Sequence, residues 1–230
     1  MNKDPKEIMV ELHEKFTNNF TEWKVVEDVQ LDRTFTCLKG IAAVGELLRE
    51  HSKSKHHEIC CKIYDEIFSD GASALYLAST SMDKPANIVL RRVLELGVAA
   101  LYLWDMPHMA HSWNSHDQDL SFTEMLNHIN SKGYLEYVNL ENSIIIDKEI
   151  LPGKRLQKIY GDLSDIVHGK ITTFESSMPD RFKFVEREWL AFIELIEEIL
   201  EILLNAFVIR YNFKDMVFIQ VPQLKKELNL

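Results

Sequence analysis

The stretch from Val93 to Trp104 constrains the fold most, because Glu95 is its only charged side chain. A helix that is apolar on every side lies in a protein core or in a membrane, since a surface helix needs one polar face. The run is too short to cross a bilayer, and Arg91, Arg92 and Asp105 flank it closely. It therefore predicts a central core helix surrounded by other helices, in a protein without a membrane span.

The rest of the chain repeats the helical pattern. In the first segment, Ile8, Leu12, Phe16 and Phe20 recur every four residues, which places them on one helix face. Eight glycines and six prolines in 230 residues predict few turns and long elements. We therefore predict an all-α fold, a helical bundle of about six to seven helices. Residues 216–221 are rich in β-branched and aromatic side chains and predict a short C-terminal edge strand or a docking tail.

The polar run from Arg49 to Lys55 is the best candidate for an exposed linker. It divides the chain into an N-terminal helical extension, residues 1–54, and a helical bundle, residues 55–230. In the bundle, the last long helix is expected from about Val185 to Tyr211. Its glutamates should form an acidic exposed face.

Charge and cysteine content bear on partners and compartment. The formal net charge is −10, which argues against a protein that coats nucleic acid through bulk electrostatics and leaves room for a small basic pocket. Cys37, Cys60 and Cys61 do not form a disulfide framework, and residues 1–7 do not resemble a signal peptide. A reducing compartment, the cytoplasm, is therefore expected.

Several motifs are missing from the sequence. It has no glycine-rich phosphate loop of the GxGxxG or GxxxxGK[ST] type, and no HExxH or GxSxG pattern. These absences argue against P-loop NTPases, kinases, dinucleotide-dependent dehydrogenases, zincins and α/β hydrolases.

Residues 108–119 form a histidine-rich polar stretch, with His108, His111, His116 and Asp117 as conceivable metal ligands. Nothing in the sequence supplies the hydrogen-bonding partners that would orient such ligands. We expect a solvated loop anchored by Trp104 and Trp113, and we predict no metal and no cofactor.

Two helices, the central one and a later one, carry polar residues at spacings that place them on one side of the helix. At the start of the central helix, Glu95 follows Arg91 by four residues and Arg92 by three, close enough to pair with either. In the helix expected over residues 152–168, the polar side chains recur at every fourth position and form one stripe: Tyr160, Ser164 and His168.

If these two helices pack antiparallel, Arg92 and Glu95 face Ser164 and His168. Such a cluster could bind a phosphate or perform general acid–base chemistry, with His168 titrating near neutral pH. It could equally be an internal polar network that fixes the register of the two helices.

Two stretches, LRRVLELGVAALYLW (residues 90–104) and YGDLSDIVHG (residues 160–169), resemble signatures of HEPN-type helical domains. The resemblance implies a bundle of four or five helices, often dimeric, and in many members a metal-independent ribonuclease of toxin–antitoxin or anti-phage systems. The implied motif is an arginine followed, after four to six residues, by a histidine. His168 matches the histidine, whereas residues 161–163 hold no arginine.

Two functions therefore stay open. In the first, the chain belongs to a prokaryotic defence or toxin system and cleaves RNA, as a homodimer or in a protein complex. Its catalytic residues would be His168, Arg92, Glu95 and Ser164, and its RNA- or nucleotide-binding residues Arg91 and Tyr160. In the second, the chain is a non-catalytic scaffold that contacts its partner through the acidic last helix and residues 216–221.

Overall fold

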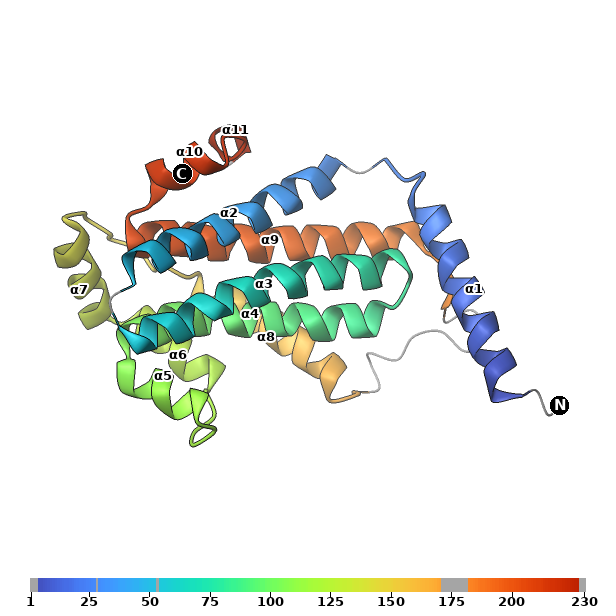
Figure 1. Cartoon of the computed structure of the whole chain (residues 1–230), viewed down its shortest axis with the longest axis horizontal. Coiled ribbons are helices and arrows are strands. Elements are labelled where there is room, and N and C mark those ends of the chain that lie inside the picture. Colours follow the sequence, from blue (N-terminus) through green and yellow to red (C-terminus); the bar gives the residue numbers. More distant parts are fainter. Residues whose placement is uncertain (1–3, 28, 53, 171–181, 228–230) are drawn as a thin grey trace.

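The computed structural model describes residues 4–27, 29–52, 54–170 and 182–227. Within these ranges the chain forms eleven helices and no strand (Figure 1). The helices are α1 Pro5–Trp23, α2 Val29–His51, α3 Lys55–Ser79, α4 Asp83–Asp105, α5 Pro107–Asn114, α6 Phe122–Ile129, α7 Lys132–Asn142, α8 Gly153–Val167, α9 Glu186–Tyr211, α10 Lys214–Gln220 and α11 Leu224–Glu227. The all-α prediction is confirmed, and the predicted number of six to seven helices is too low.

Helix α4 is the central helix that the apolar run predicts. Val93, Leu94, Val98 and Leu101 are completely buried, and α4 packs against α3, α6, α8 and α9. Gly97 permits a close crossing with α9, since a Cβ atom there would lie 2.4 Å from Leu203 Cδ1. The lack of a side chain at position 97 therefore sets how near α4 and α9 approach each other.

The additional helices are short and occupy segments that the sequence assigned otherwise. The histidine-rich stretch begins with α5, in which Pro107 occupies the first turn and Ala110 is buried. Residues 216–221 are not a strand: α10 covers most of them, with Val217 and Phe218 buried. Burial of one side of this segment against the bundle, and not its β-branched composition, determines its conformation.

Helix α2 lies within the bundle. Its Leu38, Ile41 and Val44 belong to the same buried cluster as the side chains of α3 and α9. The boundary predicted after residue 54 falls in the short segment between α2 and α3. The division into an extension and a bundle stays a prediction. Helix α2, which precedes the predicted boundary, lies beside α9 and α3 (Figure 1) and shares their core.

The expected acidic exposed face of α9 is wrong for three of the six glutamates of this helix. Glu197 and Glu201 pair with Arg33 of α2, and Glu198 pairs with Arg155 of α8. Neighbouring helices cover both flanks of α9, so these carboxylates bind arginines instead of facing solvent. In the described part of the chain, no helix has the length and hydropathy that a membrane crossing needs.

Candidate functional site

Helices α4 and α8 meet along a polar seam built on Arg91. The Arg91 Nε donates to Ser164 Oγ at 3.0 Å, and its Nη2 donates to Tyr160 Oη at 2.6 Å. The same Nη2 lies 2.9 Å from Glu95 Oε1, four residues further along α4. The polar residues that meet across the two helices are thus Arg91, Glu95, Tyr160 and Ser164, which we call the Arg91 seam. The sequence analysis expected Arg92 in the place that Arg91 takes.

Tyr160 is held from three sides. Its hydroxyl donates to Glu95 Oε1 at 3.1 Å, the Arg91 guanidinium lies 4.7 Å from its ring centre, and Phe122 of α6 stacks on it at 4.1 Å. The seam is only half-buried, with side-chain exposures of 21% for Arg91 and 32% for Glu95. Solvent therefore screens its charges in part.

Arg92 does not join the seam, which corrects the prediction that it faces Ser164 and His168. Its Nη1 donates to Asp70 Oδ1 at 2.6 Å, and its Nη2 donates to Glu66 Oε2 at 2.7 Å, both on α3. Successive residues on an α-helix point about 100° apart, so neighbours at positions 91 and 92 serve different sides of α4. Desolvation raises the pKa of Asp70, and the nearby Arg92 charge opposes this rise.

His168 is the C-cap of α8 and is exposed. Its backbone N–H donates to the Ser164 carbonyl, so it lies one turn beyond the seam. Among the described residues, its imidazole has no hydrogen-bond or ion-pair partner. The structure thus brings Ser164 to Arg91 and leaves the histidine free at the end of the same helix.

A pocket of about 240 Å³ adjoins the seam between α4, α5 and α6. Leu96, Ala99, Leu120 and Met125 contribute apolar surface to it, and Trp113 lines it as well. Glu95 belongs both to the seam and to this pocket. The predicted anchoring role of Trp113 fits its packing against the core.

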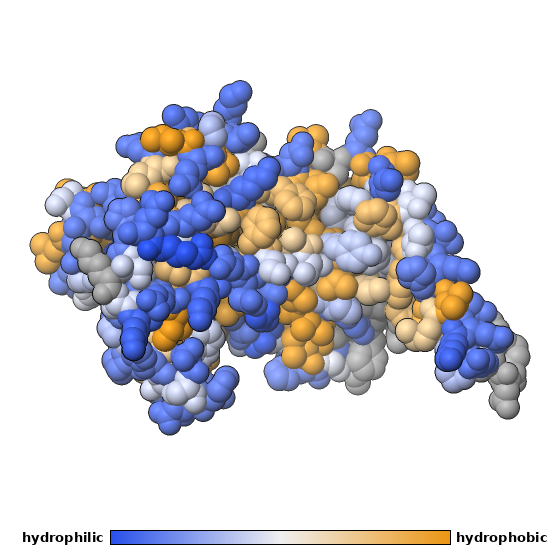
Figure 2. Space-filling model, viewed as in Figure 1, coloured by the Kyte–Doolittle hydropathy of each residue, from blue (hydrophilic) through white to orange (hydrophobic). Residues whose placement is uncertain are grey.

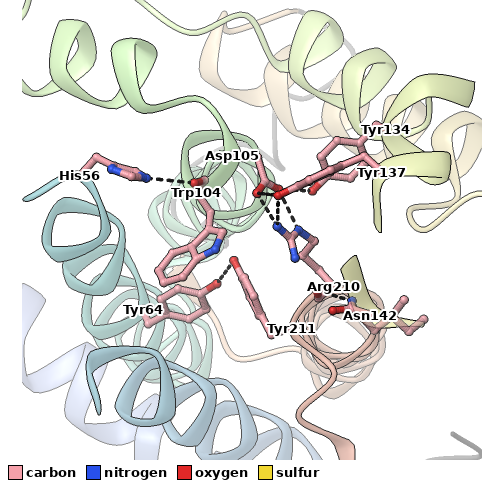
Figure 3. A network of polar contacts seen from close by, with 10 residues as sticks. His56, Tyr64, Trp104, Asp105, Tyr134, Tyr137, Asn142, Arg210 and Tyr211 are labelled. Atoms are coloured by element: carbon pink, nitrogen blue, oxygen red, sulfur yellow. Dashed lines mark hydrogen bonds and ion pairs between the residues drawn. The ribbon is translucent and has the colours of Figure 1, made fainter. Parts of the chain in front are cut away.

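A second polar network, which the sequence did not predict, closes the other end of α4 (Figure 3). Asp105 pairs with Arg210 of α9, with side-chain exposures of 8% and 5%. The Arg210 Nε donates to Asp105 Oδ2 at 2.7 Å, and the hydroxyl of Tyr134 donates to the same oxygen at 2.8 Å. Tyr137 donates to the other carboxylate oxygen at 3.3 Å. A lone arginine in the apolar stretch of residues 203–211 is the signal that could have revealed it.

Burial and the Asp105 carboxylate together shift the pKa values of this second network. Desolvation and the Asp105 charge raise the pKa of Tyr134, so its hydroxyl stays a donor. Burial alone would lower the pKa of Arg210, but the hydrogen bonds and charge of Asp105 raise it above its usual value. The Arg210 guanidinium therefore stays charged beside the Asp105 carboxylate inside the fold.

The nearby His57 is held as a neutral ring. It stacks on Trp104 with ring centres 3.8 Å apart and planes within 5°. Burial, reinforced by the adjacent His56, lowers the pKa of His57 to about 4. Its Nδ1 is buried and has no hydrogen-bond partner among the described residues. Protonation of His57 consequently opposes folding.

The structure offers no reactive thiol and no metal cluster in its described part. Burial raises the pKa of Cys60 to about 12, so its thiol stays protonated near neutral pH. Cys37, Cys60 and Cys61 are all buried. The residues that the structure describes contain no group of three or more His, Cys, Asp or Glu side chains arranged to hold a metal ion.

Comparison with known proteins gives no match: no family model, no curated protein and no solved structure is significantly similar to this chain. The resemblance to HEPN-type domains therefore stays a prediction from the two sequence stretches.

Proposed function

We propose that this chain is a non-catalytic helical module, HEPN-like in character, that works as a scaffold within a prokaryotic defence or regulatory complex in the cytoplasm. The observation that carries the proposal is the engagement of both candidate arginines within the protein. Arg91 binds Ser164, Tyr160 and Glu95, and Arg92 binds Glu66 and Asp70.

A guanidinium that stabilises a phosphate must present its N–H groups to the ligand. Here, carboxylates neutralise both guanidinium groups, which opposes phosphate binding. The formal net charge of −10 acts in the same direction at longer range. Both features support a seam that fixes the register of α4 and α8 over a seam that binds RNA.

One observation favours the alternative, a metal-independent ribonuclease. The Arg91–Ser164 hydrogen bond lies one helical turn from the exposed His168. Arg91, and not Arg92, would then supply the missing arginine, with Glu95, Ser164 and Tyr160 around it. RNA would have to displace Glu95 from Arg91 before the phosphate could bind.

The experiment that separates the two functions is an RNA cleavage assay with the full chain. Purified protein is incubated with mixed cellular RNA in EDTA from pH 6 to 8, beside a His168→Ala variant. The exposed position of His168 leaves the fold of this variant intact, which circular dichroism verifies.

The scaffold proposal expects no cleavage beyond that of the His168→Ala protein. Cleavage that the wild-type chain performs and the variant lacks would overturn it and establish the ribonuclease. Loss of that cleavage in Arg91→Lys, with Arg92→Lys still active, would then identify the arginine.

A further inference from the structure

The pocket between α4, α5 and α6 has no part in the proposed function, and its lining suits a small organic ligand. Its volume is about 240 Å³, which at about 30 Å³ per water-sized group corresponds to a ligand of about eight to ten non-hydrogen atoms. Ala99 and Met125 of its lining are buried, and Leu96 and Leu120 are half-buried. The visible surface over α5, at the lower left of Figure 2, is by contrast largely hydrophilic. Apolar walls that contain a few polar groups are typical of sites for small organic molecules.

Two carboxylates at this pocket keep oxygen atoms for a ligand. In the part of the chain that the structure describes, Arg91 and Tyr160 both contact Oε1 of Glu95, and no side chain contacts its Oε2. Asp119 is exposed and has no hydrogen-bond or ion-pair partner among the described residues. A ligand in the pocket therefore meets negative charge that the fold itself leaves without a counter-ion.

The charged side chains in and beside the pocket are acidic on balance. Arg92 also lines the pocket, but Asp70 and Glu66 of α3 bind its guanidinium. Together with the Arg91 seam this makes four carboxylates for two guanidinium groups, namely Glu66, Asp70, Glu95 and Asp119 for Arg91 and Arg92. The formal net charge of −10 acts in the same direction at longer range. The pocket therefore repels anions, phosphate included, and attracts cations.

Trp113 of α5 adds an aromatic surface to the same pocket. Its side chain is half-buried, and among the described residues no cation and no other ring contacts it. Tryptophan binds cations over its ring face more strongly than any other aromatic side chain. Metal cations take several protein ligands at once, and the described residues contain no group of three or more His, Cys, Asp or Glu side chains arranged to hold one. Carboxylates, an indole ring and apolar walls together suit an organic cation.

We propose that this pocket binds a primary ammonium ion with a short apolar body, of the alkylamine or arylalkylamine class. The ammonium group has three N–H donors, for which Asp119 and Glu95 Oε2 are the acceptors. The apolar body packs on Trp113 and on the apolar lining, which removes its surface from water. The inference does not rest on the proposed function, because amine binding involves no RNA and the RNA assay tests that function separately.

NMR titration of the full chain, followed through its indole N–H signals, tests the pocket. The chain has four tryptophans, and a Trp113→Phe protein identifies the Trp113 signal. The probes are phenethylammonium and hexylammonium, the neutral alcohols of the same shape (2-phenylethanol and 1-hexanol), and phenylacetate as the anion. We expect at least one of the two ammonium ions to shift the Trp113 signal saturably, with a dissociation constant of about 0.1–1 mM. The matching alcohol and phenylacetate should bind at least about tenfold more weakly.

Asp119→Asn removes the unpaired charge at an exposed position and should weaken ammonium binding about fivefold. Asp117→Asn removes the same charge at an exposed position of the same loop outside the pocket lining, so it is the matched control and should change the affinity less than about twofold. If neither ammonium ion shifts the Trp113 signal saturably up to about 10 mM, the proposal is overturned. Alcohols that bind as tightly as the amines overturn it as well, and so do equal affinities of the two aspartate variants.

Discussion

Helix α4 takes part in two networks of similar composition, and burial distinguishes them. Near its middle, Arg91 meets a carboxylate and a tyrosine hydroxyl at a half-exposed seam. At its end, Asp105 pairs with Arg210 and accepts hydrogen bonds from two tyrosines, and the two side chains of the ion pair have exposures below one tenth. Water competes for the groups of the seam and is largely excluded from the ion pair. The comparison teaches that the exposed network can exchange partners, whereas the buried one must stay complete.

The largest effect is expected where the buried pair is broken. Asp105→Ala leaves the Arg210 guanidinium buried without its counter-ion, which should cost about 3–5 kcal/mol of the free energy of unfolding. Urea unfolding followed by circular dichroism measures it. Asp105→Leu combined with Arg210→Met should recover most of the loss, because it removes both charges together. Equal loss in the single and double variants would contradict this account of the buried end.

The second prediction concerns His57, close to the buried end of α4, and the pH dependence of the free energy of unfolding. The pKa of His57 is lowered in the fold to about 4 from its ordinary value of 6.5. Unfolded chains therefore bind a proton between pH 6.5 and 4 that folded chains do not, so the stability contribution present above pH 6.5 falls as pH decreases through this window. With allowance for partial exposure, we expect about 1–2 kcal/mol.

His57→Phe keeps the stacking on Trp104 and should abolish this part of the pH dependence. Unfolding curves between pH 4 and pH 7.5 provide the measurement. His108→Phe, on the exposed side of α5, is the control and should keep the wild-type slope. An unchanged slope in His57→Phe would place the pH sensitivity elsewhere in the molecule.

The third prediction concerns the Arg91 seam, where each substitution leaves groups that water can reach. Arg91→Met and Tyr160→Phe should each lower the free energy of unfolding by about 1 kcal/mol. Their double-mutant cycle should give a coupling of about 0.5–1 kcal/mol, since the 2.6 Å hydrogen bond forms only when both side chains are present. A coupling near zero would mean that the two side chains touch without stabilising each other.

The smallest effect is expected at the ion pair between α8 and α9. Arg155 and Glu198 have side-chain exposures of 45% and 34%, and hydrogen bonding to Arg155 lowers the pKa of Glu198. Arg155→Ala should cost less than about 0.5 kcal/mol in urea unfolding. If Arg155→Ala lowered the free energy of unfolding as much as Asp105→Ala does, burial would not be what decides how much a polar contact stabilises this fold.

The sequence was sufficient for the fold class and for the polar stripe of α8, because both follow from helical periodicity. The apolar run identified α4 as central, and spacing by four placed Tyr160 and Ser164 on one side of α8. Periodicity does not say which neighbour across the core a side chain meets. For that reason the sequence assigned Arg92 to the wrong helix and missed the Asp105–Arg210 pair, whose partners come from distant parts of the chain.

The absence of a side chain at position 97 has a consequence for how such a chain can vary. Position 97 and Leu203 share one fixed volume where α4 crosses α9. A larger side chain at position 97 is tolerated only when the side chain at position 203 is smaller or adopts another rotamer. Descendants of this sequence with alanine or serine at position 97 should therefore carry valine or alanine at position 203. Such paired replacements would mark the crossing in sequences too divergent to align elsewhere.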